Sequence, residues 1–545
     1  MTRRWILTAA SLAEALRLLR PFGPIAALAT LVGGASGIAT AWLLAIINRS
    51  LHDPVGLSEV LASFVALCAL SAAGTALAGT LNSTMGQRLV AELRKEIAAR
   101  ILRTPLAVLE AHRAHRLMSV LTTDIDNLSV FTFSLSGYAV AAATTIGSFA
   151  YLWILSRSAC GVAVLALGLG IVMNNIARTT WIRDYERVRT AQDDLHSQYR
   201  AITDGAKELK MSRARRGRVH GVLLAGAADR IAALKSHAMR LFWVADGAGS
   251  AIFFAVIGLL VIARHRLGVT EDALSGVVIV LLYVKGPITL LASAVPEFDQ
   301  ARIAFHRIAQ LSADIADHEP NVSLEATDGA KAYRIAFNAI ELRKVTYTFP
   351  ASGSTTPFML GPIDLSIRHG ELLFVIGDNG SGKTTLIKLL LGLYAPQSGF
   401  IQVDGQTVTA ETRDDYRQLF STVFSDYYLF GDLAYGTVPS VANANLERLG
   451  LAGKVRVEDE RFSTIDLSTG QRKRLALVHA FLESRPILVT DEWAADQDPD
   501  FRRLFYEDLL PALKATGTTL IVVSHDDRYF HVADRVLRLK EGRLI

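Results

Sequence analysis

The segment Gly377 to Thr384 (GDNGSGKT) combines closely spaced glycines with a lysine and a threonine. It matches the pattern G-x-x-x-x-G-K-[ST] in full and follows Leu372 to Ile376, an apolar run typical of a buried strand. Glycines let backbone N–H groups curl around phosphates at a helix N-terminus. The segment therefore predicts a phosphate-binding loop, with Lys383 bridging the β and γ phosphates and the Thr384 hydroxyl holding Mg²⁺. We assign to the nucleotide the residues Gly377, Asp378, Asn379, Gly380, Ser381, Gly382, Lys383, Thr384 and the adjoining Thr385.

Two further apolar runs end in side chains that could complete such a site. Asp491 and Glu492 follow the run from Ile487 to Thr490. His525 comes two residues after the run from Leu520 to Val523. Ligands of doubly wound folds bind at the carboxyl ends of parallel strands, so we expect these side chains to meet there. Asp491 would complete the Mg²⁺ site, Glu492 would orient or deprotonate the attacking water, and His525 would sense the γ phosphate. Lys383, Glu492 and His525 are the predicted catalytic set.

The elements that position these residues form an α/β region preceded by six charge-poor runs. Each run is long enough to cross a bilayer, whose apolar core needs about 20 residues per helix. A single run could be a buried core helix, but six in half a chain favour a membrane domain. The runs are approximately Pro24 to Ile47, Val60 to Leu81, Thr132 to Leu155, Ala159 to Ile176, Leu241 to Ala263 and Ala273 to Val295.

The composition of the 545 residues agrees with a membrane protein. Hydrophobic residues make up 51% of the chain and charged residues 20%. The mean hydropathy of +0.30 is too apolar for an ordinary cytosolic enzyme and excludes intrinsic disorder. Cys68 and Cys160 both lie in apolar surroundings, so neither a disulfide framework nor a cysteine-based zinc site is supported.

The net charge of +5 is explained by membrane topology. Basic residues gather before the first run and in two long connections, Ser83 to Asp124 and Arg178 to His237. The positive-inside rule places these segments and the N-terminus in the cytoplasm, although Arg264 and Arg266 in an external loop weaken the pattern. No cleavable signal sequence is evident. A nucleic-acid partner is therefore the weakest interpretation.

The two long connections are rich in helix formers and predict helices that continue beyond the bilayer. Turns are expected near Pro105 in the first connection, and near Gly205 and Gly217 in the second. Within the spans, Asp246 and Lys285 are costly to place in lipid. They could line a polar substrate path, or serve as a structural ion pair or reach the membrane interface.

These features together predict the fold class and its boundaries. Residues 1–300 are expected to form an α-helical, six-span transmembrane domain with long intracellular helices. Residues 301–334 would be a linker, and residues 335–545 an α/β P-loop nucleotide-binding domain.

The five residues Leu467-Ser468-Thr469-Gly470-Gln471, upstream of Asp491 and Glu492, give the chain a family resemblance. With the phosphate loop and His525, they resemble the nucleotide-binding domain of an ABC transporter. Six spans ahead of one such domain are similar to a half-size exporter with long intracellular helices. The resemblance implies a homodimer that hydrolyses ATP with Mg²⁺.

The resemblance also assigns residues. Ser468 and Gly470, with Thr469 and Gln471 beside them, would contact ATP held by the partner subunit. Asp498 matches the family's D-loop aspartate. Phe349 would stack on adenine, with Tyr347 as the fallback. The turns near Pro105 and Gly205 would be coupling helices that dock on nucleotide-binding domains.

The chain departs from the family's pattern at Ser425, where a glutamine is expected. In the family this glutamine contacts the metal and the attacking water. Another residue would have to make that contact here, for example Asp426 through a bridging water. The segment Gly431 to Asp466 is also short.

Three stretches narrow the resemblance to a bacterial subfamily of cyclic-peptide and siderophore exporters, which includes the pyoverdine, syringomycin and microcin J25 exporters. They are Asp491 to Arg503, Ser524 to Phe530, and Gly205 to Lys210. The resemblance implies ATP-driven export of a cyclic peptide, siderophore or siderophore precursor across the bacterial inner membrane by alternating access. Membrane lipid would surround the protein, and a periplasmic or outer-membrane partner is left open. The rivals are a lipid or multidrug exporter or flippase, an importer, and an ATP-dependent sensor.

Overall fold

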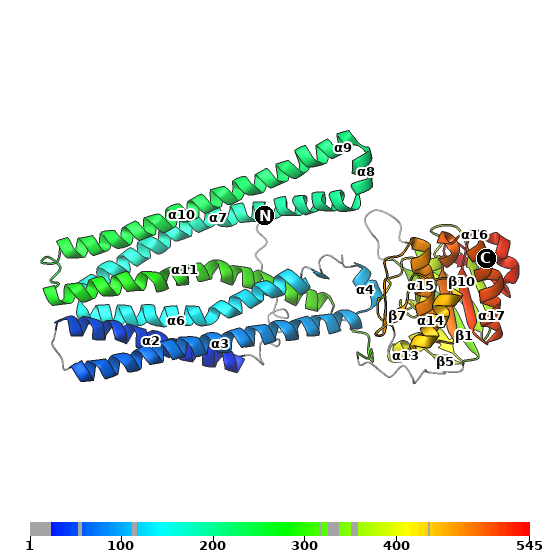
Figure 1. Ribbon diagram of the computed structural model, residues 1–545, viewed down its shortest axis with the longest axis horizontal. Coiled ribbons are helices and arrows are strands. Elements are labelled where there is room, and N and C mark those ends of the chain that lie inside the picture. The colour runs from blue at the N-terminus through cyan, green and yellow to red at the C-terminus, as the bar shows by residue number, and fades with distance from the viewer. Residues whose placement is uncertain are drawn as a thin grey trace. The chain divides into compact units, whose positions relative to one another are not determined.

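A computed structural model of the chain describes residues 23–52, 57–111, 117–118, 120–315, 318–324, 337–349, 358–433 and 437–545. The chain divides into two compact units, shown with their elements in Figure 1. The first unit combines Met1–Leu93 with Thr122–Ala309, and the second combines Arg94–Leu121 with Gln310–Ile545. This division differs from the predicted boundary at residue 300, which falls inside a continuous helix, α11 (Glu271–Asp314). The basic residues before the first span lie outside the described residues.

Within the described residues, six long helices form the membrane part. Five stretches of the described residues are long and apolar enough to cross a bilayer, and they match five of the predicted spans. The remaining span lies in α7, where the apolar helical stretch Arg157–Met173 is shorter. The helices are α2 (Gly23–His52), α3 (Leu57–Arg103), α6 (Ile125–Leu155), α7 (Arg157–Asp204), α10 (Ala225–Ile262) and α11.

Small residues let these helices approach closely. The helix α2 packs along α6, and α7 packs along α10 (Figure 1). A Cβ atom on Gly37 would lie 2.6 Å from the Val140 carbonyl oxygen, so only glycine fits this contact between α2 and α6. Association of helices in lipid depends on such close packing, because no hydrophobic force acts between them there.

Both long connections extend as helices and then turn. In the first, Pro105 separates α3 from the short helix α4 (Leu106–Ala111), as predicted. In the second, α7 ends before Gly205, and α8 (Ala206–Met211) and α9 (Arg213–Arg218) follow. The predicted turn at Gly217 is wrong. The second break falls instead at Ser212, whose side chain accepts a hydrogen bond from the Arg215 N–H and caps α9.

The second unit contains two main sheets. The antiparallel sheet has the order β2-β1-β4-β5, and the larger sheet has the order β12-β11-β3-β10-β9-β6 with parallel pairing from β11 to β6. The strands are β1 (Ala339–Thr348), β2 (Met359–Arg368), β3 (Leu372–Ile376), β4 (Ser398–Val403), β5 (Gln406–Thr407), β6 (Phe420–Val423), β9 (Ile487–Asp491), β10 (Thr519–Val523), β11 (Arg535–Lys540) and β12 (Arg543–Leu544). A small hairpin pairs β7 (Val457–Glu458) with β8 (Arg461–Phe462).

Every residue of β3, β9 and β10 is buried, which explains their continuous apolar sequences. Helices accompany this sheet: α12 (Lys383–Leu390), α13 (Arg413–Arg417), α14 (Pro439–Arg448), α15 (Thr469–Leu482), α16 (Pro499–Arg503) and α17 (Leu510–Ala515). The carboxyl ends of β3, β9 and β10 therefore meet at one edge, where the predicted site residues lie.

Candidate active site

The phosphate loop connects β3 to α12, as the sequence predicts. Gly377 has a φ of 153°, and a Cβ atom there would lie 2.2 Å from the Leu539 carbonyl oxygen. Gly382 has a φ of 103° directly before α12. Side chains are excluded at both positions, so the loop stays narrow and keeps its backbone N–H groups available for phosphate.

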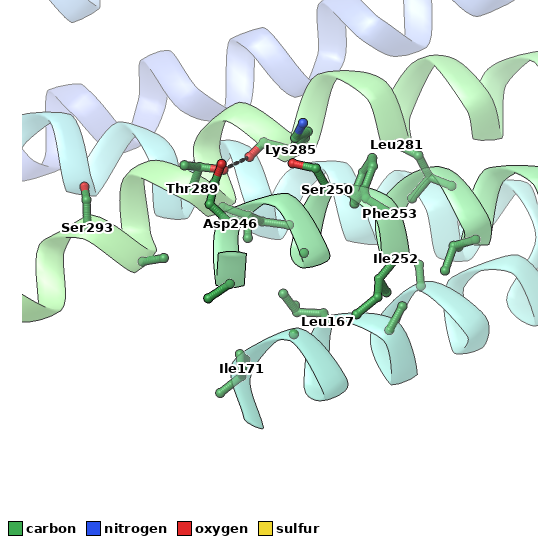
Figure 2. A pocket seen from close by; sticks show the side chains of 18 of the residues that line it. Leu167, Ile171, Asp246, Ser250, Ile252, Phe253, Leu281, Lys285, Thr289 and Ser293 are labelled. Carbon is green, nitrogen blue, oxygen red and sulfur yellow. Dashed lines mark hydrogen bonds between the residues drawn. The ribbon is translucent and has the colours of Figure 1, made fainter. Parts of the chain in front are cut away.

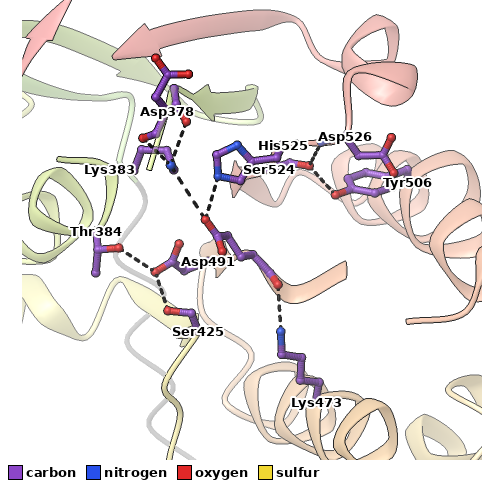
Figure 3. Close-up of polar contacts among 12 residues, drawn as sticks. Asp378, Lys383, Thr384, Ser425, Lys473, Asp491, Tyr506, Ser524, His525 and Asp526 are labelled. Carbon is purple, nitrogen blue, oxygen red and sulfur yellow. Dashed lines mark hydrogen bonds and ion pairs between the residues drawn. The ribbon is translucent and has the colours of Figure 1, made fainter. Parts of the chain in front are cut away.

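Lys383 is buried inside this loop. Its ammonium donates hydrogen bonds to the carbonyl oxygens of Gly377 at 2.9 Å and Asp378 at 3.1 Å. It also lies 3.9 Å from Glu492 Oε1 (Figure 3). The loop thus holds a positive charge at its centre, beside the predicted catalytic carboxylate, where phosphate oxygens can replace the two carbonyls.

Asp491 receives two hydroxyl contacts at the end of β9. Thr384 Oγ1 donates to Asp491 Oδ2 at 3.4 Å, and Ser425 Oγ donates to the same oxygen at 3.3 Å (Figure 3). Burial raises the pKa of Asp491, the neighbouring Glu492 charge raises it further, and the two hydroxyl contacts oppose them. The described contacts join Ser425, and not Asp426, to this carboxylate.

The Thr384 hydroxyl and Asp491 carboxylate oxygens suit Mg²⁺, which prefers hard oxygen ligands. This ion usually keeps waters and substrate phosphates in its coordination shell. Among the described residues, no group of three His, Cys, Asp or Glu could hold a metal ion without such help. The Thr384 hydroxyl and the Asp491 carboxylate would therefore hold Mg²⁺ together with ATP.

Glu492 and His525 are brought together from β9 and β10. His525 Nε2 lies 3.0 Å from Glu492 Oε1 (Figure 3). The Glu492 N–H donates to the Val523 carbonyl oxygen at 3.1 Å, which ties the glutamate to the neighbouring strand. A carboxylate fixed between an ammonium and an imidazole can orient a water and accept its proton.

The signature residues begin α15 and face solvent. Ser468 and Thr469 are exposed, and the Gln471 side chain accepts a hydrogen bond from the Ser468 N–H at 3.3 Å. Within the described part of the chain, no hydrogen bond or ion pair joins them to the phosphate loop. Asp498 caps α16 by accepting from the Phe501 N–H at 2.9 Å.

The two candidate adenine-stacking residues differ in their surroundings. Tyr347 is buried and stacked on Tyr394, with ring centroids 4.6 Å apart and an angle of 10° between the rings. Phe349 is half-buried, and its ring meets Tyr347 edge to face at 5.3 Å. Because Tyr394 already covers one face of Tyr347, Phe349 is better placed to stack on a base.

The short helix α4 is attached to the nucleotide-binding part of its own unit. Glu110 accepts a hydrogen bond from Lys388 Nζ at 2.7 Å and another from the Tyr394 hydroxyl. Leu106 and Ala107 pack against the core that contains β3 and α12. The turn predicted at Pro105 therefore brings α4 onto α12, the helix that follows the phosphate loop.

A cavity of about 360 Å³ lies among α7, α10 and α11 in the membrane part. Its lining is mostly apolar, but Asp246 and Lys285 both contribute to it (Figure 2). No ion pair joins these two side chains in the described residues. Lys285 Nζ lies instead 5.5 Å from the centroid of the Phe254 ring. The apolar lining includes Leu167, Ile171, Phe242, Ile252, Phe253 and Leu281.

Comparison with known proteins identifies the family. The sequence matches the ABC transporter family over residues 360–495 and the ABC transporter transmembrane region over residues 24–199. It is 35% identical over 526 residues to the ATP-binding protein SyrD of Pseudomonas syringae pv. syringae, covering 94% of this chain and 93% of that protein. The chain belongs to the ABC transporter family. As an ABC exporter half-transporter, it couples ATP hydrolysis to transport across a membrane.

Other relatives share the ABC exporter architecture. An ATP-dependent lipid A-core flippase of Burkholderia orbicola (strain AU 1054) is 27% identical over 492 residues, covering 85% of this chain and 79% of that protein. The structure of a bacterial Atm1-family ABC exporter with ATP bound superposes with a TM-score of 0.72 at 19% identity. It covers 96% of this chain and 94% of that one, which confirms the fold.

Sequence reasoning missed two buried polar residues of this ABC transporter site, Lys473 and Gln497. Lys473 Nζ donates to the Glu492 carbonyl oxygen at 3.0 Å, and Gln497 Nε2 donates to the Gly470 carbonyl oxygen at 3.0 Å. Helical spacing carries a signal for the lysine, because Leu477, four residues later on the same face, is fully buried. This spacing could have indicated that position 473 faces the core.

Proposed function

We propose that this half-transporter exports a cyclic peptide, a siderophore or a siderophore precursor across the bacterial inner membrane as a homodimer. The observation that carries the proposal is the resemblance of Asp491 to Arg503 and Ser524 to Phe530 to peptide and siderophore exporters. The full-length similarity to SyrD supports it. In this arrangement the N-terminus and the nucleotide-binding domain lie in the cytoplasm.

The exposed start of α15 supports a site shared by two chains. Ser468 and Gly470 would reach the γ phosphate of ATP held by Lys383 of the partner subunit. ATP then binds the closed dimer better than the open one, because the signature contacts form only on closure. Bound Mg²⁺ would neutralise phosphate charge. Glu492 would take the proton of the attacking water, and hydrolysis would reopen the dimer.

We further infer that the cavity among α7, α10 and α11 forms part of the cargo path. Its volume of about 360 Å³ lies in the range of about 300 to 1,000 Å³ typical of small-molecule sites. Charged groups inside a membrane domain are costly and usually serve a ligand or one another. Asp246 and Lys285, set in an apolar wall, suit a molecule that combines apolar side chains with polar or charged groups.

Substitution in the cavity tests this part of the proposal. Asp246→Asn should change the stimulation of ATP hydrolysis by peptide cargo at least severalfold and leave the unstimulated rate intact. Asp229→Asn, the same change at an exposed position of α10, is the matched control. Equal responses of the two variants to cargo would contradict a role of the cavity in cargo binding.

The second candidate function is lipid or multidrug export. It is favoured by the similarity to proteins named lipid A-core flippase, which are 24% to 31% identical. The largely apolar cavity lining is also compatible with an acyl chain. ATP hydrolysis that responds to lipids and not to peptides would support this alternative.

The deciding experiment compares a peptide-producing strain that carries the wild-type chain with one that carries Glu492→Gln. Peptide metabolites are measured inside the cells and in the medium by mass spectrometry. Accumulation of one cyclic peptide or siderophore precursor inside, with its loss from the medium, would support the proposal and identify the cargo. An unchanged peptide profile with redistributed lipids would replace it with lipid transport.

A further inference from the structure

Lys473 is a buried lysine that the ATP-hydrolysis scheme above does not use. It lies on α15, three residues after Gly470, and is only 5% exposed. Its ammonium donates to the Glu492 carbonyl oxygen at 3.0 Å and pairs with Asp496 Oδ2 at 2.7 Å. Figure 3 shows the first of these contacts, reaching from the lysine to the backbone of the glutamate. Burying an ammonium is costly, and both of its partners lie in the segment that follows β9.

This segment, residues 492–498, is here called the catalytic loop. Its first residue, Glu492, has a φ of 50°, in the left-handed region, which is strained for a residue other than glycine. The Lys473 ammonium holds the carbonyl group of this same residue. The lysine therefore fixes the strained backbone from which the catalytic carboxylate projects.

Further contacts attach the catalytic loop to the first turns of α15. Trp493 Nε1 donates to the Lys473 carbonyl oxygen at 2.7 Å, and the Trp493 side chain is buried. Gln497 Nε2 donates to the Gly470 carbonyl oxygen at 3.0 Å. A Cβ atom on Gly470 would lie 2.9 Å from the Asp496 carbonyl oxygen, so the two backbones are in close contact. The start of α15 cannot shift without moving the loop.

We propose that Lys473 is a positioning residue that joins the signature helix to the catalytic loop of the same chain. Contact of the signature with ATP on the partner subunit is then transmitted to Glu492 in the chain's own site. Binding of ATP at one site thereby affects the position of the catalytic carboxylate at the other site. This inference rests on the proposed shared site, in which the signature of one chain contacts ATP held by the other.

Dimers of two different chains distinguish a role of Lys473 in positioning Glu492 from a role in shaping the signature residues. One chain, the blocked chain, carries Glu492→Gln, so only the site of the other, intact chain turns over. That active site combines the phosphate loop and Glu492 of the intact chain with the signature of the blocked chain. Lys473→Met is placed in either chain, and two different affinity tags isolate each mixed dimer.

With Lys473→Met in the intact chain, kcat should fall about tenfold or more, with KM for ATP changed less than about twofold. The loss corresponds to removal of a charge-assisted hydrogen bond that holds the catalytic carboxylate. The same substitution in the blocked chain should cost far less. A larger loss in the blocked chain would show that Lys473 shapes the signature, and equal losses would show a general structural role. Either result overturns the proposal.

Two further variants keep the test interpretable. Asp496→Asn removes only the ionic contact of Lys473 with a half-exposed partner, so this variant should fold even if Lys473→Met does not. Its loss of kcat should again be larger in the intact chain than in the blocked chain, but smaller than the loss caused by Lys473→Met. Lys473→Arg, which keeps the charge, should restore part of the lost rate. The thermal unfolding temperature of each dimer is measured alongside.

A separate variant tests whether the two chains share a site at all. Ser468→Arg in the blocked chain places a bulky charge where the signature would meet the partner's ATP, and it should abolish turnover of the intact site. Normal turnover there would refute the shared site. Loss of turnover there, combined with equal effects of Lys473→Met in both chains, would refute only the role of Lys473.

Discussion

Ser425 and Asp491 form a contact that replaces an interaction expected from a glutamine. Burial and the Glu492 charge both raise the pKa of Asp491, whereas the hydroxyl groups of Ser425 and Thr384 lower it. In the proposed Mg²⁺ site Asp491 must be ionised, so these hydroxyl groups would keep the carboxylate functional at lower pH. The structure therefore gives the serine an electrostatic role that a longer amide side chain would perform differently.

Ser425→Ala should shift the pH dependence of ATP hydrolysis. Loss of the hydroxyl donor raises the pKa of Asp491 further, so the acidic limb of kcat/KM should move to higher pH. The rate near pH 8 should change little. The measurement is a pH profile of kcat/KM for ATP at saturating Mg²⁺, with Ser398→Ala, at an exposed position of β4, as the control. An unmoved acidic limb would contradict the assignment.

Glu492→Gln should bind ATP but fail to hydrolyse it. The amide has the size of the carboxylate but cannot accept a proton, so turnover should fall by roughly 10²- to 10⁴-fold. ATP retention and the fraction of closed dimers should rise, as measured by bound nucleotide and by cross-linking. Hydrolysis near the wild-type rate would remove Glu492 from the role of base.

Much of the nucleotide site is predictable from sequence. Asp491 ends the buried strand β9, and Lys383 and His525 follow the buried strands β3 and β10. Parallel strands bring their carboxyl ends together at one edge of a sheet. Lys473 is different. It stands in a cationic run, Gln471 to Arg474, which resembles a solvated helix face, and its burial depends on the path of the loop after Glu492. Contacts of that kind are set by tertiary structure and leave only a weak periodic signal.

At the scale of elements, the six residues of α4 depend on neighbours for their place. None of these residues is fully buried, so Glu110 and the packing of Leu106 and Ala107 hold the helix. The contact of Glu110 with Lys388 is half-exposed and is worth about 1 kcal/mol after solvent screening. Burial and the Glu110 contact raise the pKa of Tyr394, so its hydroxyl remains a donor at physiological pH.

Glu110→Gln should uncouple hydrolysis from transport. The amide weakens both contacts of α4 but touches no residue of the phosphate loop, so unstimulated ATP hydrolysis should retain more than about half its rate. Export in vesicles should fall severalfold. Glu96→Gln, which removes an exposed pair on α3, serves as the control. Parallel loss of hydrolysis and export would indicate damage to the nucleotide site instead.

Element boundaries show where sequence patterns fail. The break at Pro105 was predictable because proline lacks an N–H and excludes a continued helix. Gly217 was misleading, since a single glycine costs a helix only about 1 kcal/mol and neighbouring residues can support it. The true break at Ser212 depends on a cap, which local sequence indicates only weakly because serines are common in long helices.

At the scale of the whole molecule, the predicted six crossings would place the two long connections on one side of the membrane. After Cys68→Ser and Cys160→Ala, single cysteines are introduced at His265 and at Ala214, both exposed. A membrane-impermeant maleimide should label position 265 in intact cells. It should label position 214 only after the membrane is opened. The reverse pattern would invert the topology.

The exposed signature at the start of α15 also has a genetic consequence. If Ser468 and Gly470 serve the partner's site, an inactive copy impairs every dimer that it enters. Equal synthesis of normal and defective chains with random pairing leaves only about a quarter of dimers with two intact sites. An allele that carries both Ser468→Arg and Glu492→Gln disables both sites of every mixed dimer, so cells that carry it beside the wild-type gene should export about a quarter of the normal amount.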